Sequence, residues 1–124
     1  MLVGSALLML ALPILYGPGF IRALGPMRMV GNRENVPAIE GWFARAKRGH
    51  ANLGENLIPF AALVLVAQAA GVHSAWTRGG AILFLVARLA HIASYIAGAG
   101  PARTAAYASG LLGTLIIAGA VMVR

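Results

Sequence analysis

The sequence lacks cysteine and has few charged residues. It contains 124 residues, of which 10% are charged and none is cysteine. A soluble domain carries roughly 25% charged residues, so this composition is not typical of one. The missing cysteine excludes disulfides, thiolate metal sites and a cysteine nucleophile. Any thiol chemistry must therefore use a thiol that a ligand brings.

Apolar residues, in contrast, make up 60% of the chain, and the formal net charge is +7. This composition predicts an integral membrane protein with one domain, residues 1–124. A basic chain often binds nucleic acid, but here the positive charges lie at the ends of apolar segments. The positive-inside rule and a small anionic ligand explain them better. We therefore expect a lipid bilayer around the chain and no nucleic acid.

Four segments are long and apolar enough to cross a bilayer, for which a helix needs about 20 residues. They cover about residues 2–21, 42–72, 75–98 and 101–123. The first segment lacks the basic start and short apolar core of a signal peptide, so we interpret it as a membrane span. Short loops join the last three segments, which are expected to pack antiparallel. The predicted fold class is all-α, a four-helix membrane bundle.

Lysine and arginine are distributed unevenly between the two sides of this bundle. The first and third loops and their flanks hold Arg22, Arg28, Arg33, Arg45, Lys47, Arg48 and Arg103, whereas the other side holds only Arg78 and Arg124. Loops rich in Lys and Arg stay in the cytoplasm. The first and third loops are therefore predicted to be cytoplasmic, with the N- and C-termini outside the cytoplasm.

A polar stripe opens the second segment. Arg45, Arg48, Asn52 and Glu55 are spaced 3, 4 and 3 residues apart, so they share one helix face at about 100° per residue. A charge at the membrane centre costs roughly 2.5–3.5 kcal/mol on insertion scales. These side chains are therefore expected to meet a partner or a ligand, with Arg45 as a supporting or interfacial charge.

The third segment carries Arg88, His91 and Tyr95 on one face. A pairing of Arg88 with Glu55 would be structural, and it would not exclude a ligand. His91 is a candidate acid or base, although a lone histidine in a membrane helix is more often structural. A metal site formed by His50, His91 and Glu55 lacks a metal-binding spacing, so we predict no metal.

The fourth segment opens near Arg103, and Tyr107 lies one turn later. Arg103 alone would suggest an interfacial anchor, and interfacial tyrosine is equally common. The predicted topology, however, places polar residues of three helices in one half of the bilayer: Arg48, Asn52, Glu55, Arg88, His91, Tyr95, Arg103 and Tyr107. Arginines bind carboxylates bidentately, Glu55 would bind an ammonium group and Asn52 a peptide amide. Such a cavity suits a small zwitterion with net negative charge.

These motifs resemble the MAPEG family, the membrane-associated proteins of eicosanoid and glutathione metabolism, and its bacterial branch most closely. The similarity covers about residues 20–115 and includes Asn32-Arg33-Glu34-Asn35, VPAIEGWFARAKRGHANLGENLIPF, ARLAHIASYIAG and PARTAAY. The most specific element is R-A-x-R-x-H-x-N-x-x-E-N in the second segment, combined with R-x-x-H-x-x-x-Y in the third.

The resemblance implies a homotrimer in a bacterial inner membrane, with glutathione bound between subunits towards the cytoplasm. Family residues that match Arg48, Asn52, Glu55, Arg88, His91 and Tyr95 contact the tripeptide. Arg103 matches an arginine thought to stabilise the glutathione thiolate, since a nearby guanidinium lowers the pKa of a thiol. Arg22 is the nearest match to a ligand-binding arginine near the end of the first helix.

The predicted function is a glutathione transferase or peroxidase that acts on lipophilic electrophiles from the membrane. Glutathione is the co-substrate, and Arg103 and His91 are the candidate catalytic residues. One alternative is a small transporter, because some drug exporters are four-span chains of similar length. They need a membrane carboxylate, usually in the first helix, and this first segment has none. Another alternative is a non-catalytic membrane protein with a vestigial glutathione site.

Overall fold

The computed structural model of the chain describes residues 1–32 and 36–123. The predicted contributions of Arg33, Glu34, Asn35 and Arg124 lie outside the described residues. The helices are α1 (Leu2–Leu24), α2 (Pro26–Val30), α3 (Trp42–Ala69), α4 (Ala75–Ala97) and α5 (Gly100–Met122). All of these except α2 are long and apolar enough to cross a membrane. The predicted all-α membrane bundle is therefore confirmed.

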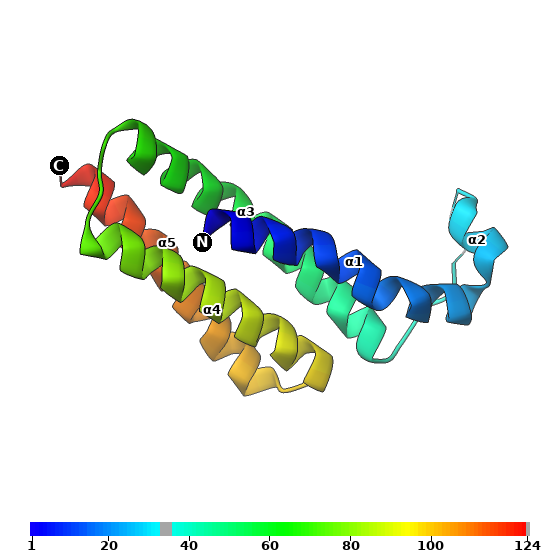
Figure 1. Cartoon of the computed structure of the whole chain (residues 1–124). Helices are drawn as coiled ribbons and strands as arrows, with labels where there is room; N and C mark the ends of the chain where they lie inside the picture. Colours follow the sequence, from blue (N-terminus) through cyan, green and yellow to red (C-terminus); the bar gives the residue numbers. More distant parts are fainter. Residues whose placement is uncertain (33–35, 124) are drawn as a thin grey trace.

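The long helices run beside one another in an elongated bundle, and α2 projects beyond it at one end (Figure 1). α4 and α5 form the most extensive pair, α3 packs against both, and α1 packs mainly on α3. We call the end formed by the start of α3, the end of α4 and the start of α5 the basic end. The opposite end, formed by the end of α3, residues 70–74 and the start of α4, is the turn end.

The helix bounds differ in detail from the predicted segments. α1 continues to Leu24, beyond residue 21, and the predicted polar loop contains the short α2. Gly25 separates these two helices with a φ of 81°, a left-handed conformation that glycine adopts without strain. α3 ends at Ala69 and not near residue 72, because the chain turns at Gly71 with a φ of 67°.

Glycines allow α4 and α5 to approach closely. A Cβ on Gly80 would lie 2.6 Å from the carbonyl oxygen of Gly113, and a Cβ on Gly113 would lie 2.7 Å from that of Gly80. Small residues serve the same purpose in membrane helix pairs generally. At the start of α4, the Ser74 hydroxyl accepts from the Thr77 N–H, and the Thr77 hydroxyl accepts from the Ser74 N–H.

Two apolar clusters fill the interior of the bundle. Phe60 of α3 and Phe84 of α4 are fully buried, and their rings stack with centroids 3.8 Å apart. Leu12, Leu53 and Ile92 form the second cluster and join α1, α3 and α4. These contacts bring the polar stripe of α3 beside the polar face of α4.

α1 is the least buried of the long helices. Only 11% of its apolar stretch is buried within the chain, and Leu10 and Ile14 are 69% and 78% exposed. A polar contact between α1 and α3 is formed by the Tyr16 hydroxyl, which lies 2.9 Å from Nδ1 of His50. The exposed apolar surface of α1 is suited to contact with lipid or with a second protein.

Candidate functional site

A cavity of about 290 Å³ opens at the basic end between α3, α4 and α5. It is lined by Arg48, Asn52, His91, Tyr95, Arg103, Thr104 and Tyr107. Six of these belong to the nine site residues predicted from the sequence. Each of the three helices contributes two of these six residues, spaced four apart, so the two side chains share one face of their helix. Thr104 is the lining residue that the prediction missed, and its position next to Arg103 near the start of α5 is the signal that could have found it.

Arg88 lies behind the wall of this cavity and not in its lining. It is 0% exposed; Nη1 donates to Oδ1 of Asn52 at 3.2 Å, and Nη2 donates to the carbonyl oxygen of Tyr107 at 3.0 Å. Its guanidinium carbon also lies 5.3 Å from the ring centroids of Phe84 and Tyr107, within cation–π range. Arg88 thus joins α3, α4 and α5. The alternative pairing with Glu55 is not found between these two described residues.

Gly110 of α5 provides the space for this guanidinium. A Cβ at position 110 would lie 2.6 Å from Nε and 2.8 Å from Cζ of Arg88. The Nε atom is buried and has no hydrogen-bond partner in the described part of the chain. The position of Arg88 therefore depends on a glycine that faces it from the next helix.

Asn52 is oriented by two neighbours. Its Oδ1 accepts from Arg88, and Nδ2 of Asn56 lies 3.4 Å from the same oxygen while donating to the Asn52 carbonyl at 2.8 Å. With Oδ1 occupied, the side-chain NH₂ of Asn52 is the group that can donate into the cavity. Asn56 is not among the predicted site residues. Its spacing of four from Asn52 could have indicated the contact.

His91 stands between two tyrosines. Its ring centroid lies 5.0 Å from that of Tyr95 and 6.0 Å from that of Tyr107, and the residue is 3% exposed. Nδ1 is buried without a hydrogen-bond partner among the described residues. Only Nε2 can therefore present a polar atom to the cavity, and any proton transfer by His91 would use that nitrogen.

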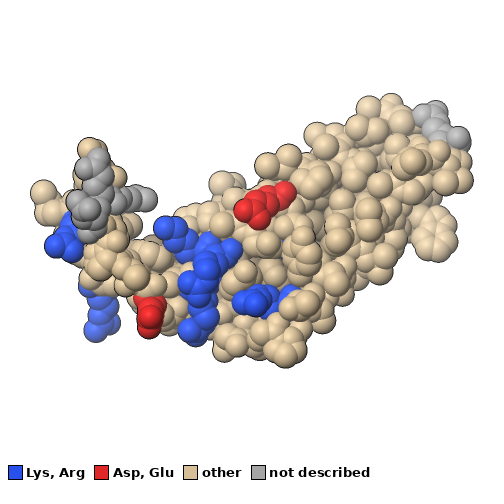
Figure 2. Space-filling model, turned by 180° about the vertical axis from the view of Figure 1, so that it is seen from behind, with Lys and Arg blue, Asp and Glu red and all other residues tan. Residues whose placement is uncertain are grey.

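Two exposed arginines make the cavity basic. Arg48 and Arg103 both line it, and no carboxylate belongs to its described lining. The guanidinium carbon of Arg103 lies 5.0 Å from the centroid of the Tyr95 ring, which holds the charge against the cavity wall. Figure 2 shows Lys and Arg side chains gathered towards the end of the molecule that carries α2. The arrangement favours an anionic ligand.

Besides Arg88, two other predicted site residues lie outside the lining of this cavity. Glu55 is exposed on α3 and lies outside the lining. Arg22, near the end of α1, lines a separate cavity of about 410 Å³ together with Trp42 and Phe43. Within one chain, neither residue belongs to the lining of the cavity that contains Arg103.

Arg45, predicted to be a supporting charge, binds the end of α4. Its Nε donates to the carbonyl oxygen of Tyr95 at 3.1 Å, and Nη2 donates to that of Ile96 at 2.9 Å. The last carbonyls of a helix carry partial negative charge, so a guanidinium stabilises them. Arg45 thereby fixes α3 to the helix that carries His91 and Tyr95.

These features define a four-helix membrane protein with a basic cavity at one end of its bundle. A model of the MAPEG family matches residues 1–123. The chain therefore belongs to the MAPEG family, as the motifs of the second and third segments indicate. Comparisons with curated proteins and with solved structures gave no match. The family includes glutathione transferases and related membrane enzymes, and this membership suggests glutathione-related chemistry for the chain.

Proposed function

We propose that the chain is a glutathione-dependent transferase or peroxidase, with glutathione bound in the cavity at the basic end and lipophilic electrophiles as substrates. The observation that carries this proposal is the convergence of Arg48, Asn52, His91, Tyr95 and Arg103 around one basic cavity in a MAPEG chain. Glutathione offers carboxylates to the arginines and amide oxygens to the Asn52 side chain. A lipophilic substrate can arrive from the bilayer along the apolar helix surfaces.

Arg103 has the central chemical role in this proposal. Its guanidinium, supported by the Tyr95 ring, favours the thiolate form of the bound glutathione. The thiolate attacks an electrophilic carbon, so that an S–C bond forms as the leaving group departs with its electron pair. With a hydroperoxide, the thiolate attacks oxygen and releases the alcohol. A second glutathione then reduces the resulting sulfenic acid, giving the disulfide and water.

The remaining cavity residues position the tripeptide. The side-chain NH₂ of Asn52 and the accessible Nε2 of His91 face the cavity from neighbouring helices, while Arg48 adds a second cation. Holding the thiolate and the substrate in a fixed geometry converts a bimolecular reaction into an effectively unimolecular one. Arg88 contributes through Asn52 and Tyr107, which it holds in place.

We further propose that a homotrimer completes the site. Glu55 and Arg22 are exposed and lie outside the cavity lining, which leaves them available to contact a glutathione bound by another copy of the chain. The exposed apolar surface of α1 is compatible with such contacts. By the distribution of Lys and Arg, the basic end faces the cytoplasm of a bacterial inner membrane and both termini lie outside it.

The proposal is tested with purified protein in detergent. Glutathione is added, the ultraviolet absorbance of the thiolate is recorded, and turnover of an activated aryl halide is measured. Arg103→Ala should abolish the thiolate signal and lower kcat/KM at least about tenfold, equivalent to roughly 1.4 kcal/mol. The matched control is Arg28→Ala, an exposed arginine on α2 away from the cavity, which should behave as the wild type. Absence of glutathione binding by the wild type, or unchanged turnover in Arg103→Ala, would overturn the proposal.

Assembly is tested by mixing inactive variants. Glu55→Gln and Arg103→Ala are each expected to lose activity as pure proteins. If different copies supply these two residues to one site, unfolding and reassembling the variants together should restore part of the wild-type activity, because some sites then receive both native residues. Light scattering in detergent should give the mass of three chains. A monomer mass, or no recovery in mixtures that do form trimers, would refute the shared site.

A further inference from the structure

A second and larger cavity lies at the turn end, opposite the proposed glutathione site. Its volume is about 470 Å³, and it is enclosed by the end of α3, the turn at residues 70–74, the start of α4 and Ile117 of α5. The predicted site residues do not include any of its lining. The cavity combines a polar part, with Gln68, His73 and Arg78, and an apolar wall that includes Val64, Ala81 and Ile117.

The polar part offers hydrogen-bond donors that are available to a ligand. Gln68, His73 and Arg78 are exposed, and none of them makes a side-chain hydrogen bond or ion pair within the described part of the chain. Ser74 and Thr77 also line the cavity, but their hydroxyls bind each other's backbone N–H groups. No carboxylate belongs to the described lining. These groups include one guanidinium, which is suited to bind an anionic partner.

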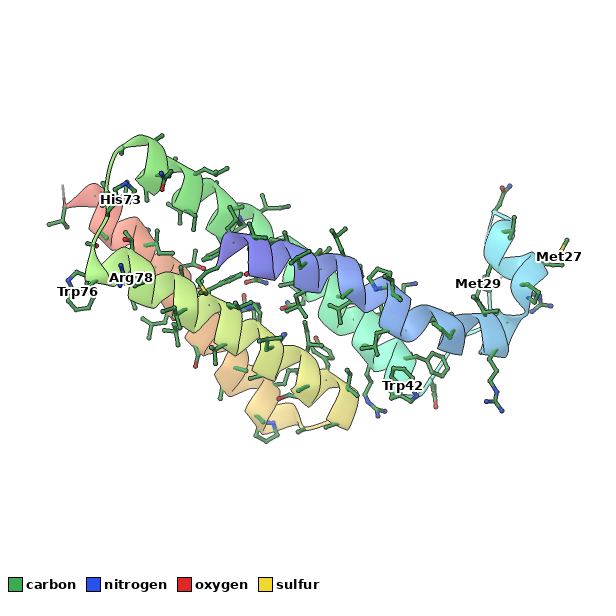
Figure 3. The ribbon with its side chains drawn as sticks, viewed as in Figure 1. Met27, Met29, Trp42, His73, Trp76 and Arg78 are labelled. Atoms are coloured by element: carbon green, nitrogen blue, oxygen red, sulfur yellow. The ribbon has the colours of Figure 1, made fainter. Side chains whose placement is uncertain are left out.

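The cavity lies where one candidate membrane span ends at Ala69 and the next begins at Ala75. Figure 3 shows His73 and Arg78 on the inner side of the α3–α4 turn and Trp76 on the outer side. Trp76 is 70% exposed in the first turn of α4. Exposed tryptophan at a span end is typical of the membrane–water interface. The polar part of the cavity therefore lies at headgroup depth, and its apolar wall continues along the spans towards the hydrocarbon.

We propose that this cavity binds an anionic phospholipid from the leaflet at the turn end. Arg78 and His73 contact the phosphate, the Gln68 amide donates to a headgroup oxygen, and the start of an acyl chain lies against Ala81 and Ile117. This site is independent of the proposed glutathione chemistry, because the two cavities lie at opposite ends of the bundle and share no residue.

The test uses Trp76 as a local reporter. The chain contains two tryptophans, so Trp42→Phe leaves Trp76 as the sole source of tryptophan fluorescence. This variant is reconstituted in bilayers with bromine-labelled phosphatidylglycerol or phosphatidylcholine, whose bromine quenches nearby tryptophan. We expect about a fivefold preference for phosphatidylglycerol, the factor that corresponds to about 1 kcal/mol for one basic residue near the surface. Arg78→Gln should abolish this preference, so that the two lipids quench Trp76 about equally.

A charge-matched control separates a built site from general attraction at the interface. The double variant Arg78→Gln/Gly79→Arg keeps the net charge and keeps a guanidinium at about the same depth in the membrane. It places that guanidinium about 100° further around the helix, away from the cavity. Position 79 accepts a side chain, since an added Cβ would meet no atom within 4 Å. The preference should stay lost in this variant. If it returns, the effect is interfacial charge alone and the proposal is wrong.

A soluble anion is the other source of the same chemistry. Glycerol phosphate in the buffer should not displace the labelled lipid; if it abolishes the preference, the cavity binds a soluble anion and the lipid proposal is overturned. Circular dichroism establishes that each variant is folded. Should Arg78→Gln fail to fold, His73→Gln is expected to lower the same preference, and an unchanged value would also overturn the proposal.

Discussion

Replacing Gly110 by alanine tests whether the buried Arg88 holds three helices together. The added Cβ would lie 2.6 Å from Nε and 2.8 Å from Cζ of Arg88, too close for either to stay in place. Arg88 is 0% exposed, so its side chain cannot swing out of the bundle. It must shift, and its hydrogen bonds to Asn52 and to the Tyr107 carbonyl must lengthen or break.

The expected loss of stability has two parts. Side-chain hydrogen bonds between membrane helices average about 0.6 kcal/mol and reach about 1.7 kcal/mol each. Overpacking of a filled position adds about 1–3 kcal/mol. Alanine gains about 1 kcal/mol over glycine in helix propensity. Gly110→Ala should therefore lower the free energy of unfolding by roughly 1–5 kcal/mol.

A second glycine of α5 provides the matched control. An added Cβ on Gly119 meets no atom within 4 Å, so Gly119→Ala should be neutral or gain up to about 1 kcal/mol. Both variants are unfolded in mixed micelles with increasing dodecyl sulfate and followed by circular dichroism. Gly110→Ala should also cost less in an Arg88→Met background, where the guanidinium is absent. Equal stability of the two alanine variants, or an equal cost in both backgrounds, would refute the reasoning.

Three further changes test contacts elsewhere in the bundle by the same unfolding assay. Gly113→Ala places a Cβ 2.7 Å from the backbone carbonyl oxygen of Gly80, so α4 and α5 should separate at a cost of about 1–3 kcal/mol; wild-type stability would contradict the close approach. Tyr16→Phe removes the 2.9 Å contact with His50 and should cost about 0.6–1.7 kcal/mol. Arg45→Met removes the donors at the end of α4 and should cost about 0.3–1 kcal/mol, with faster amide exchange confined to the last turn of that helix.

The membrane bundle and most of the cavity lining could be predicted because both depend on short-range patterns. Apolar length alone decides which segments can cross a bilayer. Helical spacing places Arg48 with Asn52, and His91 with Tyr95, whatever the tertiary contacts are. The family resemblance added Arg103 as the residue that would act on a thiol. The ligand roles of these residues stay predictions until glutathione binding is measured.

The contacts across helices could not be predicted in the same way. Asn52 and Glu55 share one helix face, and only the rotation of α3 against α4 decides which of them accepts from Arg88. The space that Gly110 leaves for the guanidinium belongs to a third helix. Arg78 is separated from Gln68 by the turn between α3 and α4, so the sequence did not indicate that both line one cavity.

The contrast between α1 and the α4–α5 pair implies an order of assembly in the membrane. α1 is synthesised first, yet only 11% of its apolar stretch is buried within the chain and its main partner is α3. α4 and α5 are joined by a short turn and meet through Gly80 and Gly113, so this hairpin needs only local contacts to form. We therefore expect the α4–α5 hairpin to form before α1 packs on α3. Loss of the hairpin contact would remove the most extensive helix pair of the bundle, whereas loss of α1 contacts would leave the hairpin intact.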